Sequence, residues 1–220
     1  MPPVHPERSP VHPERSRGRP SPAVTEHVGR LLRRLGELSD EHVEQVLAVG
    51  SVVTFTKGQK MVECGAPVLS SGLVLDGVFA EQVPTSKGRI TVSFSVEGDF
   101  VGPIADLLAR RPRASQDIVA LSAGRIVNVD WGGYLRLTET TPEWGRMHAT
   151  IMERLLLLKS ERERQLLASD AAQRLTWFED RFSTARTLLP LKEVASFLGI
   201  TPVYLSRLRR QRVLERRKAR

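Results

Sequence analysis

Leu191-Lys-Glu-Val-Ala-Ser-Phe-Leu-Gly-Ile-Thr-Pro-Val-Tyr-Leu-Ser-Arg-Leu-Arg-Arg210 carries the clearest structural pattern in this chain. Apolar residues recur in it at helical spacing on both sides of one glycine: Val194, Leu198, Ile200, Leu205 and Leu208. Gly199 supplies the positive φ of a tight turn without steric cost. Thr201 is suited to cap the second helix, and Pro202 then takes its first position, where a missing N–H costs nothing. The pattern predicts a helix-turn-helix.

The second helix of this unit is expected to expose a polar, basic face. With Leu205 and Leu208 turned inward, the N-terminal half of that helix can read base edges in a major groove, where arginine pairs with guanine in bidentate fashion. Arg207 is the candidate for that contact, while Arg209, Arg210 and Arg212 are expected to neutralise phosphates. The full set of candidate DNA-contacting residues is Thr201, Val203, Tyr204, Ser206, Arg207, Arg209, Arg210 and Arg212. The alternative is an ordinary helical hairpin with a solvated basic face.

Positive charge is concentrated at this end of the chain. Residues 202–220 hold seven arginines and one lysine against one glutamate, whereas the whole chain carries a formal net charge of +8. A basic cluster beside a groove-reading helix is typical of proteins that bind double-stranded DNA, with an affinity that falls steeply as salt rises. Double-stranded DNA is therefore the predicted partner.

Composition excludes several other classes of protein. The 220 residues suffice for one larger and one smaller domain. There is no apolar run of bilayer length and no secretory signal, so we expect a cytoplasmic protein with no membrane partner. Cys64 is the only cysteine, which excludes a disulfide framework and cysteine-ligated metal clusters. No metal site and no cofactor are predicted.

The N-terminal residues differ in character from the rest. Residues 3–9 are repeated without change as residues 10–16, and prolines recur throughout. Such a segment has too few apolar side chains to offset its ordering entropy, so residues 1–22 are expected to be a disordered tail. It is either an interaction tail or a translated low-complexity repeat, and His5 and His12 are not credible metal ligands.

The middle of the chain alternates between two periodicities. Residues 24–49 show helical spacing, with a second helix expected to begin at Ser39. From Ser51 onward, short β-rich runs are punctuated by Lys57-Gly58, Cys64-Gly65, Ser71-Gly72 and Asp76-Gly77. Residues 85–88 are expected to close a hairpin onto 90–96, and 118–121 and 125–129 supply further strands. Short strands with regularly spaced glycine turns predict an antiparallel, jelly-roll-like β-roll.

A long helix is expected to follow from Pro142. Trp144, His148, Ile151, Leu155 and Leu158 alternate in steps of four and three, a spacing typical of a helix that pairs with a copy of itself. Leu156 and Leu157 add a second apolar face. We therefore predict a homodimer in which one face of this helix contacts its own β-roll and the other contacts the partner. Such pairing would hold two recognition helices about 34 Å apart, as successive major grooves require.

The predicted fold class is α+β, with N-terminal helices, a β-roll, a dimerisation helix and a C-terminal helix-turn-helix. Its layout resembles the Crp/Fnr family of bacterial transcription regulators over residues 24–212. The stretches that carry the resemblance are Lys57-Gly58, Cys64-Gly65, Leu75-Asp-Gly77, Gly98-Asp-Phe-Val-Gly102 and residues 191–210. The resemblance implies a homodimeric regulator whose β-roll senses a small molecule, with RNA polymerase as a further partner. The expected division is a tail (1–22), a cyclic-nucleotide-binding-like sensor (23–140), a dimerisation helix (141–168) and a DNA-binding domain (169–220).

The chain departs from this family at both functional sites. Cyclic-nucleotide-binding members follow the glycine matching Gly102 with a glutamate that holds the ribose, and an Arg-Ser pair then holds the phosphate. Here Pro103 replaces the glutamate, Arg113 matches the arginine and Ala114 replaces the serine. The candidate effector site is therefore Gly102, Arg113 and Ala114, with cyclic-nucleotide binding expected to be lost and the effector unknown.

Of the family's base-reading Arg-Glu…Arg set only the last residue is kept, as Arg207. Pro202 and Val203 occupy the first two positions, so the family's target sequences cannot be transferred to this chain.

An enzyme is not expected. None of the five histidines lies between residues 51 and 129, so a metal-dependent β-roll enzyme lacks ligands. Asp99 and Asp106 are the candidates for a carboxylate pair, but Asp99 is better suited to shape its turn. The alternative to a regulator is a β-roll signalling or interaction module whose helix-turn-helix binds DNA only weakly or non-specifically.

Overall fold

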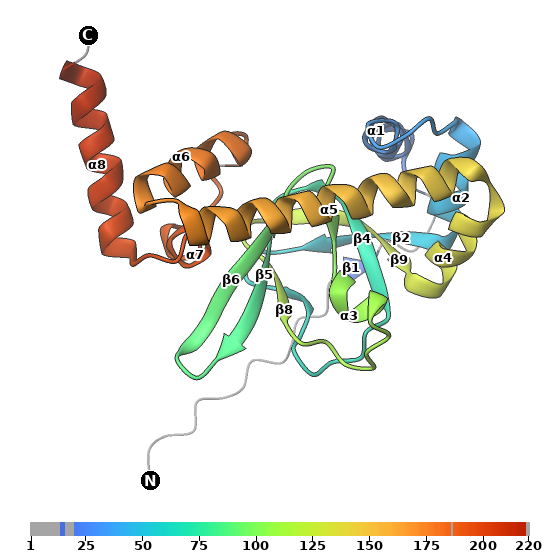
Figure 1. Cartoon of the computed structure of the whole chain (residues 1–220). Helices are drawn as coiled ribbons and strands as arrows, with labels where there is room; N and C mark the ends of the chain where they lie inside the picture. The colour runs from blue at the N-terminus through green and yellow to red at the C-terminus, as the bar shows by residue number, and fades with distance from the viewer. Residues whose placement is uncertain (1–13, 16–19, 186, 219–220) are drawn as a thin grey trace.

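The computed structural model describes residues 14–15, 20–185 and 187–218, and side chains from 20 to 185 and 187 to 214. It has the expected α+β architecture (Figure 1). Two helices, α1 (Pro22–Arg33) and α2 (Asp40–Val49), lie at one end of a β-roll. The long helix α5 (Pro142–Ala168) crosses the roll and leads to α6 (Ala171–Arg181), α7 (Leu191–Phe197) and α8 (Pro202–Lys218) at the other end.

The β-roll consists of two antiparallel sheets. One sheet contains, in spatial order, β1 (Glu14–Arg15), β2 (Gly50–Phe55), β9 (Gly124–Asp130), β4 (Ser70–Asp76) and β7 (Phe100–Val101). The other contains β3 (Lys60–Val62), β8 (Asp117–Ala120), β5 (Phe79–Thr85) and β6 (Gly88–Ser95). Buried residues of both sheets, such as Phe55, Phe79 and Ile126, form one cluster between them. The predicted β-roll and its hairpin at residues 85–88 are confirmed.

Two glycines show how the strands are brought together. Gly77 has a φ of +84°, and a Cβ there would lie 2.6 Å from the carbonyl oxygen of Ala123, so only glycine fits the turn. Gly72 was expected at a turn as well, but it lies inside β4. A Cβ there would lie 2.9 Å from Cδ1 of Ile126 on β9. The turn prediction was wrong at Gly72, because this glycine serves close strand packing instead.

Two short helices were not predicted. Helix α3 (Ile104–Leu108) follows β7, and α4 (Trp131–Thr140) joins β9 to α5. The two glycines in the first turn of α4 give it weak helical propensity. The Asp130 carboxylate compensates by accepting a hydrogen bond from the Gly133 N–H at 2.8 Å, which caps the helix.

The N-terminal tail falls mostly outside the described residues, His5 and His12 included. Within the described part, Glu14 and Arg15 pair with Thr54 and Val53 of β2 as strand β1, and α1 begins at Pro22. The prediction of disorder was wrong for these positions. Backbone hydrogen bonds to a strand do not depend on apolar side chains, and β2, which pairs with β9 on one side, offers such bonds to β1 on the other.

The face of α5 that was assigned to a partner packs inside this chain. Trp144 and Ile151 are buried in a core formed with α1, α2 and α4, and the Trp144 indole N–H donates to Gln45 Oε1 at 2.7 Å. The imidazole Nδ1 of His148 lies 3.0 Å from the Tyr134 hydroxyl. Assigning Trp144 and Ile151 to a dimer seam was therefore wrong, whereas His148 is half-buried. Alternation in steps of four and three identifies an apolar stripe but does not say what covers it.

The outward face of α5 is the other apolar face. Leu156, Leu157 and Leu167 have exposed fractions of 66, 67 and 81%, whereas Leu155 and Leu158 are half-buried over the roll. The exposed leucines lie on the C-terminal half of α5. This face is the part of α5 that is free to contact another molecule.

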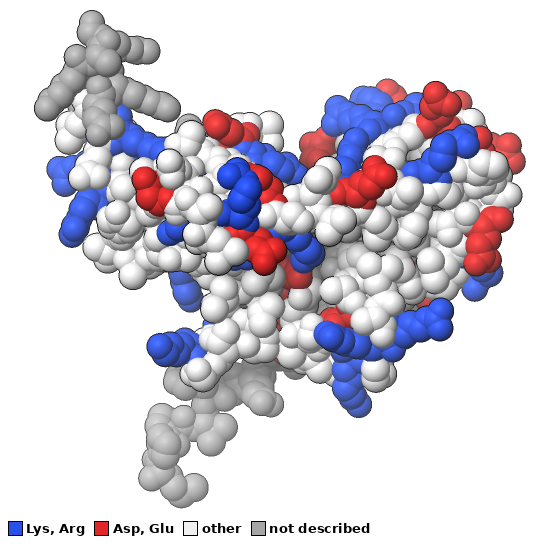
Figure 2. Space-filling view, viewed as in Figure 1, with Lys and Arg blue, Asp and Glu red and all other residues white. Residues whose placement is uncertain are grey.

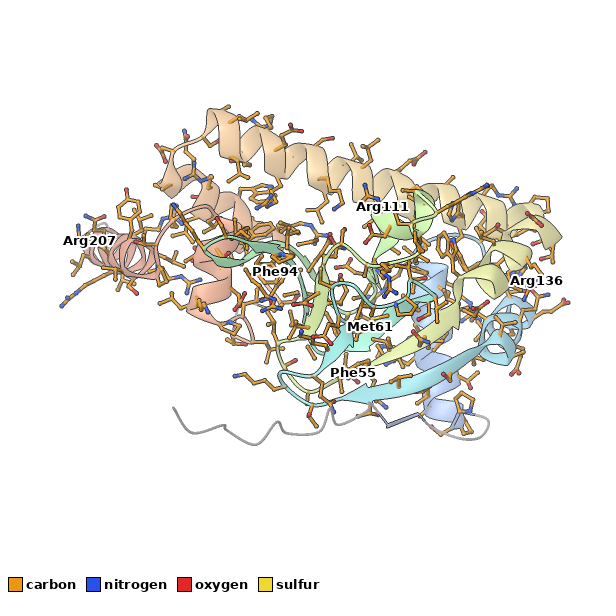
Figure 3. All side chains as sticks on the ribbon, turned by 90° about the horizontal axis from the view of Figure 1, so that it is seen from below. Phe55, Met61, Phe94, Arg111, Arg136 and Arg207 are labelled. Carbon is orange, nitrogen blue, oxygen red and sulfur yellow. The ribbon has the colours of Figure 1, made fainter. Side chains whose placement is uncertain are left out.

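An aromatic cluster joins the C-terminal helices to the β-roll. Phe94 of β6 is buried, and its ring centroid lies 6.0, 5.6 and 5.1 Å from those of Phe178, Phe182 and Phe197. The Thr91 N–H also donates to Ser196 Oγ at 2.9 Å. The two parts of the chain therefore share one continuous core. Phe94 is labelled within it in Figure 3.

Truncating Phe94 should loosen this junction. We expect Phe94→Ala to lower the free energy of unfolding by about 3–5 kcal/mol, since it leaves a cavity among buried rings. Trp177 stacks on Phe197 at 5.8 Å, whereas Trp131 and Trp144 belong to the core at the other end. The fluorescence difference between each protein and its Trp177→Phe counterpart therefore reports on the C-terminal module. In urea titrations of Phe94→Ala, that signal should change before the far-ultraviolet circular dichroism of the whole chain. Phe55→Ala, deep in the roll, is the control and should leave the two signals coincident. Coincident signals in both variants would contradict the role of Phe94 in holding the C-terminal helices on the roll.

His148 should make stability depend on pH. Burial lowers the pKa of its imidazole from the usual value of 6.5, so below about pH 6.5 the unfolded chain takes up a proton that the native chain excludes. The contribution of His148 is therefore complete above pH 6.5 and is lost as the pH falls. Urea titrations at pH 7.5 and 5.5 should show wild type losing more stability on acidification than His148→Gln. Parallel losses would refute this.

Candidate nucleic-acid interface and effector cavities

The unit formed by α7, a tight turn and α8 has the local geometry that the sequence predicts. Gly199 adopts a φ of +67° in the turn, and the Thr201 hydroxyl accepts a hydrogen bond from the Tyr204 N–H at 3.2 Å. Val194, Leu205 and Leu208 are buried in the shared core. The predicted inward face of α8 is confirmed.

The opposite face of α8 is open to solvent. Val203 and Tyr204 have exposed fractions of 70 and 42%, and Thr201, Ser206, Arg207 and Arg210 are exposed as well. Helix α8 projects from the body of the molecule (Figure 1), and Arg207 lies at the end far from Arg136 of α4 (Figure 3). Blue side chains gather on this lobe in the space-filling view (Figure 2). In the described part of the chain, neither Arg207 nor Arg210 forms an ion pair, so both are available to a partner.

Arg209 and Arg212 form ion pairs within the chain. Their guanidiniums lie 3.6 and 3.2 Å from the Glu179 carboxylate of α6, and Arg212 also donates to the Ala172 carbonyl and the Thr176 hydroxyl. The two side chains hold α8 against α6, while the expected phosphate contacts would require them to leave these partners. The role of Glu179 could not be predicted from the sequence, since a single acidic residue on a helix gives no signal of what it faces.

The three candidate effector residues do not form one site. Gly102, with a φ of +151°, lines a cavity beside α3. Ala114 is buried, and Arg113 is exposed, with Nη1 donating to the Gly65 carbonyl at 2.7 Å. The expectation that Arg113 faces an effector together with Gly102 was wrong.

A buried carboxylate explains the course of the chain at Arg113. Asp106 is fully buried and accepts hydrogen bonds from the Ser115 N–H at 2.8 Å, the Ser115 hydroxyl at 2.9 Å and Arg111 Nη1 at 3.0 Å. Burial alone would raise the pKa of Asp106, but these donors lower it, so the carboxylate stays ionised. Its hydrogen bonds to Arg111 and Ser115 fix the conformation of residues 111–115. Asp99, in contrast, accepts from the Val96 N–H at 3.0 Å and shapes its turn, as expected.

Two adjoining cavities lie between α5 and the β-roll. The first, here named the roll cavity, has a volume of about 440 Å³ and lies against α3. Its walls are mainly apolar, with Ile104, Leu108 and Met152 among them. Glu81 and Lys159 stand 3.8 Å apart at its polar side, and burial raises the pKa of Glu81.

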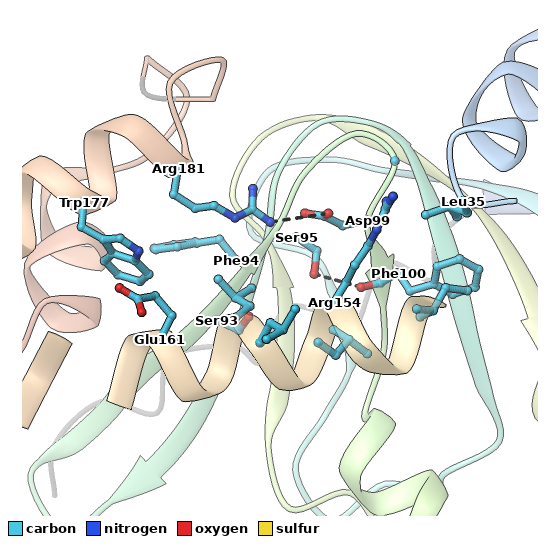
Figure 4. A pocket seen from close by; sticks show the side chains of 15 residues that line it. Leu35, Ser93, Phe94, Ser95, Asp99, Phe100, Arg154, Glu161, Trp177 and Arg181 are labelled. Carbon is cyan, nitrogen blue, oxygen red and sulfur yellow. Dashed lines mark hydrogen bonds and ion pairs between the residues drawn. The ribbon is translucent and has the colours of Figure 1, made fainter. Parts of the chain in front are cut away.

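The second cavity, here named the junction cavity, has a volume of about 510 Å³ and lies where α5, the turn after β6 and α6 meet (Figure 4). It is more polar, because Asp99, Arg154 and Arg181 line it. Both cavities share walls made by Ser93, Ser95, Phe100, Leu155 and Leu158. Two residues of the expected dimer seam, Leu155 and Leu158, thus form the partition between cavities.

The described residues give no indication of a metal centre or a membrane span. No group of three or more His, Cys, Asp or Glu side chains among them is placed to hold a metal ion. No helix in the described part of the chain is both long and apolar enough to cross a bilayer.

Solved structures with the same fold include several regulators. FixK2 from Bradyrhizobium japonicum matches with a TM-score of 0.66 and 16% identity, over 76% of this chain and 86% of that one. The regulator CLP of Xanthomonas campestris, described as responsive to c-di-GMP, matches with a TM-score of 0.64 and 14% identity, over 80 and 93%. A cyclic nucleotide-binding domain containing protein from Listeria monocytogenes has a TM-score of 0.62 and 14% identity, over 86 and 91%. The chain has the fold of Crp/Fnr regulators.

Sequence comparison adds nothing to this likeness. No protein-family model matches the chain, and no curated protein matches it either. At such low identities the structural likeness concerns the fold, and the chemistry must be argued from the side chains themselves.

Proposed function

We propose that this protein is a homodimeric, sequence-specific DNA-binding transcription regulator. The observation that carries the proposal is the division of α8 into two faces. Leu205 and Leu208 anchor it in the core, while Arg207 and its neighbours stand free on the side that faces solvent. A helix held in this way can enter a major groove with its N-terminal residues against the bases.

The charges on α8 support two different kinds of DNA contact. Arg207, near the start of the helix, is suited to a bidentate contact with a guanine, and Ser206 and Tyr204 stand beside it. Arg210, one turn further along, is suited to a phosphate. Thr201 and Val203 complete the surface that would approach the duplex. In this proposal Arg209 and Arg212 contribute by holding α8 on Glu179.

The dimer contact is proposed on the outward face of α5. Leu156 and Leu167 lie on the same side of that helix, eleven residues apart, and Leu157 is exposed beside Leu156. Large apolar side chains exposed together indicate an interaction surface. A parallel pair of α5 helices would place two copies of α8 on the same side of the dimer, as a two-fold symmetric operator requires.

The roll is proposed to have lost cyclic-nucleotide binding. Pro103 cannot accept a hydrogen bond from a ribose through its side chain, and Arg113 is turned to the Gly65 carbonyl. RNA polymerase is a further proposed partner, in keeping with the role of a regulator. Catalysis is not part of the proposal, because the Asp106 carboxylate forms an ion pair with Arg111 and Asp99 shapes a turn.

Arginine substitutions on α8 test DNA recognition. Against a duplex selected from a random library, we expect Arg207→Ala to lose about 1–3 kcal/mol of binding free energy and much of the sequence preference. Arg210→Ala should weaken binding to selected and random duplexes alike and reduce the salt slope by about one. Fluorescence anisotropy at two salt concentrations measures both effects. Arg136→Ala, at the far end of the molecule, is the control.

One outcome would favour the alternative function. If wild type binds selected and random duplexes equally and Arg207→Ala behaves like Arg210→Ala, the protein is a signalling or interaction module with a non-specific basic surface, and the proposal is wrong.

The dimer contact has its own test. We expect the double substitution Leu156→Glu and Leu167→Glu to convert a dimer into a monomer in sedimentation velocity, since it places paired carboxylates in the contact. Leu69→Glu, at an exposed leucine of the roll, is the matched control and should stay dimeric. A wild-type monomer at micromolar concentration, or a dimeric double variant, would refute the assignment.

A further inference from the structure

We propose that the junction cavity is a binding site for a small aromatic monoanion, a carboxylic acid with one or two rings. Ligand cavities of about 300–1,000 Å³ are typical of sites for molecules of this size, and the junction cavity falls within that range at about 510 Å³. Binding itself is independent of the proposed function, whereas its effect on DNA rests on that proposal.

Three parts of the chain form most of the walls, and Leu35, which follows α1, completes them (Figure 4). The β-roll contributes Ser93, Ser95 and Asp99, α5 contributes Arg154, Leu157 and Glu161, and α6 contributes Trp177 and Arg181. Arg154 and Arg181 approach Asp99 from different helices in Figure 4. A ligand in this space would therefore contact the sensor, the long helix and the C-terminal module at once.

The cavity walls carry two guanidiniums, Arg154 and Arg181, and two carboxylates, Asp99 and Glu161. One excess positive charge results when Arg164, which stands outside the cavity and pairs with Glu161, is included. Glu161 is already paired, because Arg164 donates to its two oxygens at 2.6 and 2.9 Å. Asp99 then stands alone against Arg154 and Arg181, and its separation of 4.0 Å from Arg181 is at the limit of an ion pair. Burial raises the pKa of Asp99 although both guanidiniums act to lower it. A monoanion would balance the excess and accept charge-assisted hydrogen bonds from these arginines.

Donors remain free in the cavity. Arg154 uses one Nη2–H on the Arg34 carbonyl at 3.0 Å, and guanidinium has five N–H donors. In the described part of the chain, the Ser93 hydroxyl and the Trp177 indole N–H have no hydrogen-bond partner. These groups can complete the coordination of a carboxylate and orient the rest of the molecule.

Trp177 is the reason for expecting a ring. Its indole stacks on Phe197, with 10° between the ring planes, so that one face is held by the core. Since Trp177 also lines the cavity beside Phe94 and Leu158, a flat ligand can pack against it. Offset or edge-to-face contacts between rings contribute about 0.5–1.5 kcal/mol beyond the area they bury.

A ligand bound here would stabilise the observed position of the C-terminal module. It would bridge Asp99 on the roll and Arg181 on α6, which the Phe94 cluster already holds together. Under the proposed function, the affinity of α8 for DNA should therefore differ between the free and the bound protein, and DNA should change the affinity for the ligand by the same factor.

The test uses 1-naphthoate as the probe and neutral 1-naphthamide as its isostere, without DNA. Naphthoate should quench the part of the tryptophan fluorescence that Trp177→Leu removes, and it should bind at least tenfold more tightly than the amide by calorimetry. Arg181→Gln and Arg154→Gln should each weaken naphthoate binding about ten- to a hundredfold, in line with loss of a charge-assisted hydrogen bond. Trp177→Leu should weaken naphthoate and naphthamide alike. Arg136→Gln, far from the cavity, should change nothing.

Several results would overturn the site. They are no saturable binding of naphthoate, equal binding of acid and amide, or full retention of binding in the Arg154→Gln, Arg181→Gln double variant. Inorganic phosphate bound as tightly as naphthoate would also refute the aromatic class. If naphthoate binds as expected but leaves the affinity for the selected duplex unchanged, the site stands and only its link to DNA binding fails.

Discussion

The packing of Phe94 against Phe178, Phe182 and Phe197 fixes the C-terminal helices on the β-roll. Without it, α6, α7 and α8 would be connected to the roll through the end of α5 and through polar contacts of α7 with β5 and β6. With it, the C-terminal module has a fixed position, because buried rings at van der Waals distance do not slide independently. The orientation of α8 and the existence of the junction cavity both follow from this contact.

Hydrogen bonds fix the orientation of α7 at the same contact. Glu193 of α7 accepts a hydrogen bond from Gln82 Nε2 at 2.8 Å and another from the Thr91 hydroxyl, and Arg162 of α5 donates to the Phe197 carbonyl at 3.1 Å. Aromatic packing alone tolerates some rotation, whereas directional hydrogen bonds between partly buried groups restrict it. A change in the roll near β6 would therefore reach α7 directly.

The sequence predicted what is decided locally. Gly199, Thr201 and Leu205 behave as expected, because a turn, a cap and a helix face depend on residues a few positions away. It failed where a distant neighbour decides. Ile151 is buried in this chain's own core, and Arg212 pairs with Glu179. Arg113 donates to the Gly65 carbonyl instead of facing the cavity beside Gly102. An apolar stripe or a free arginine does not say which surface it will meet.

Helix α5 connects every function proposed for this chain. Its inner side closes both cavities, through Leu155 and Leu158, and its outer side carries the proposed dimer contact. Because Leu157 borders the junction cavity and is exposed on the outer side, a ligand and a partner subunit would meet the same side chain. Coupling between sites is reciprocal, so dimerisation should change ligand affinity as much as the ligand changes dimerisation. A rigid helix that contacts the ligand on one side and the partner subunit on the other is sufficient for such coupling.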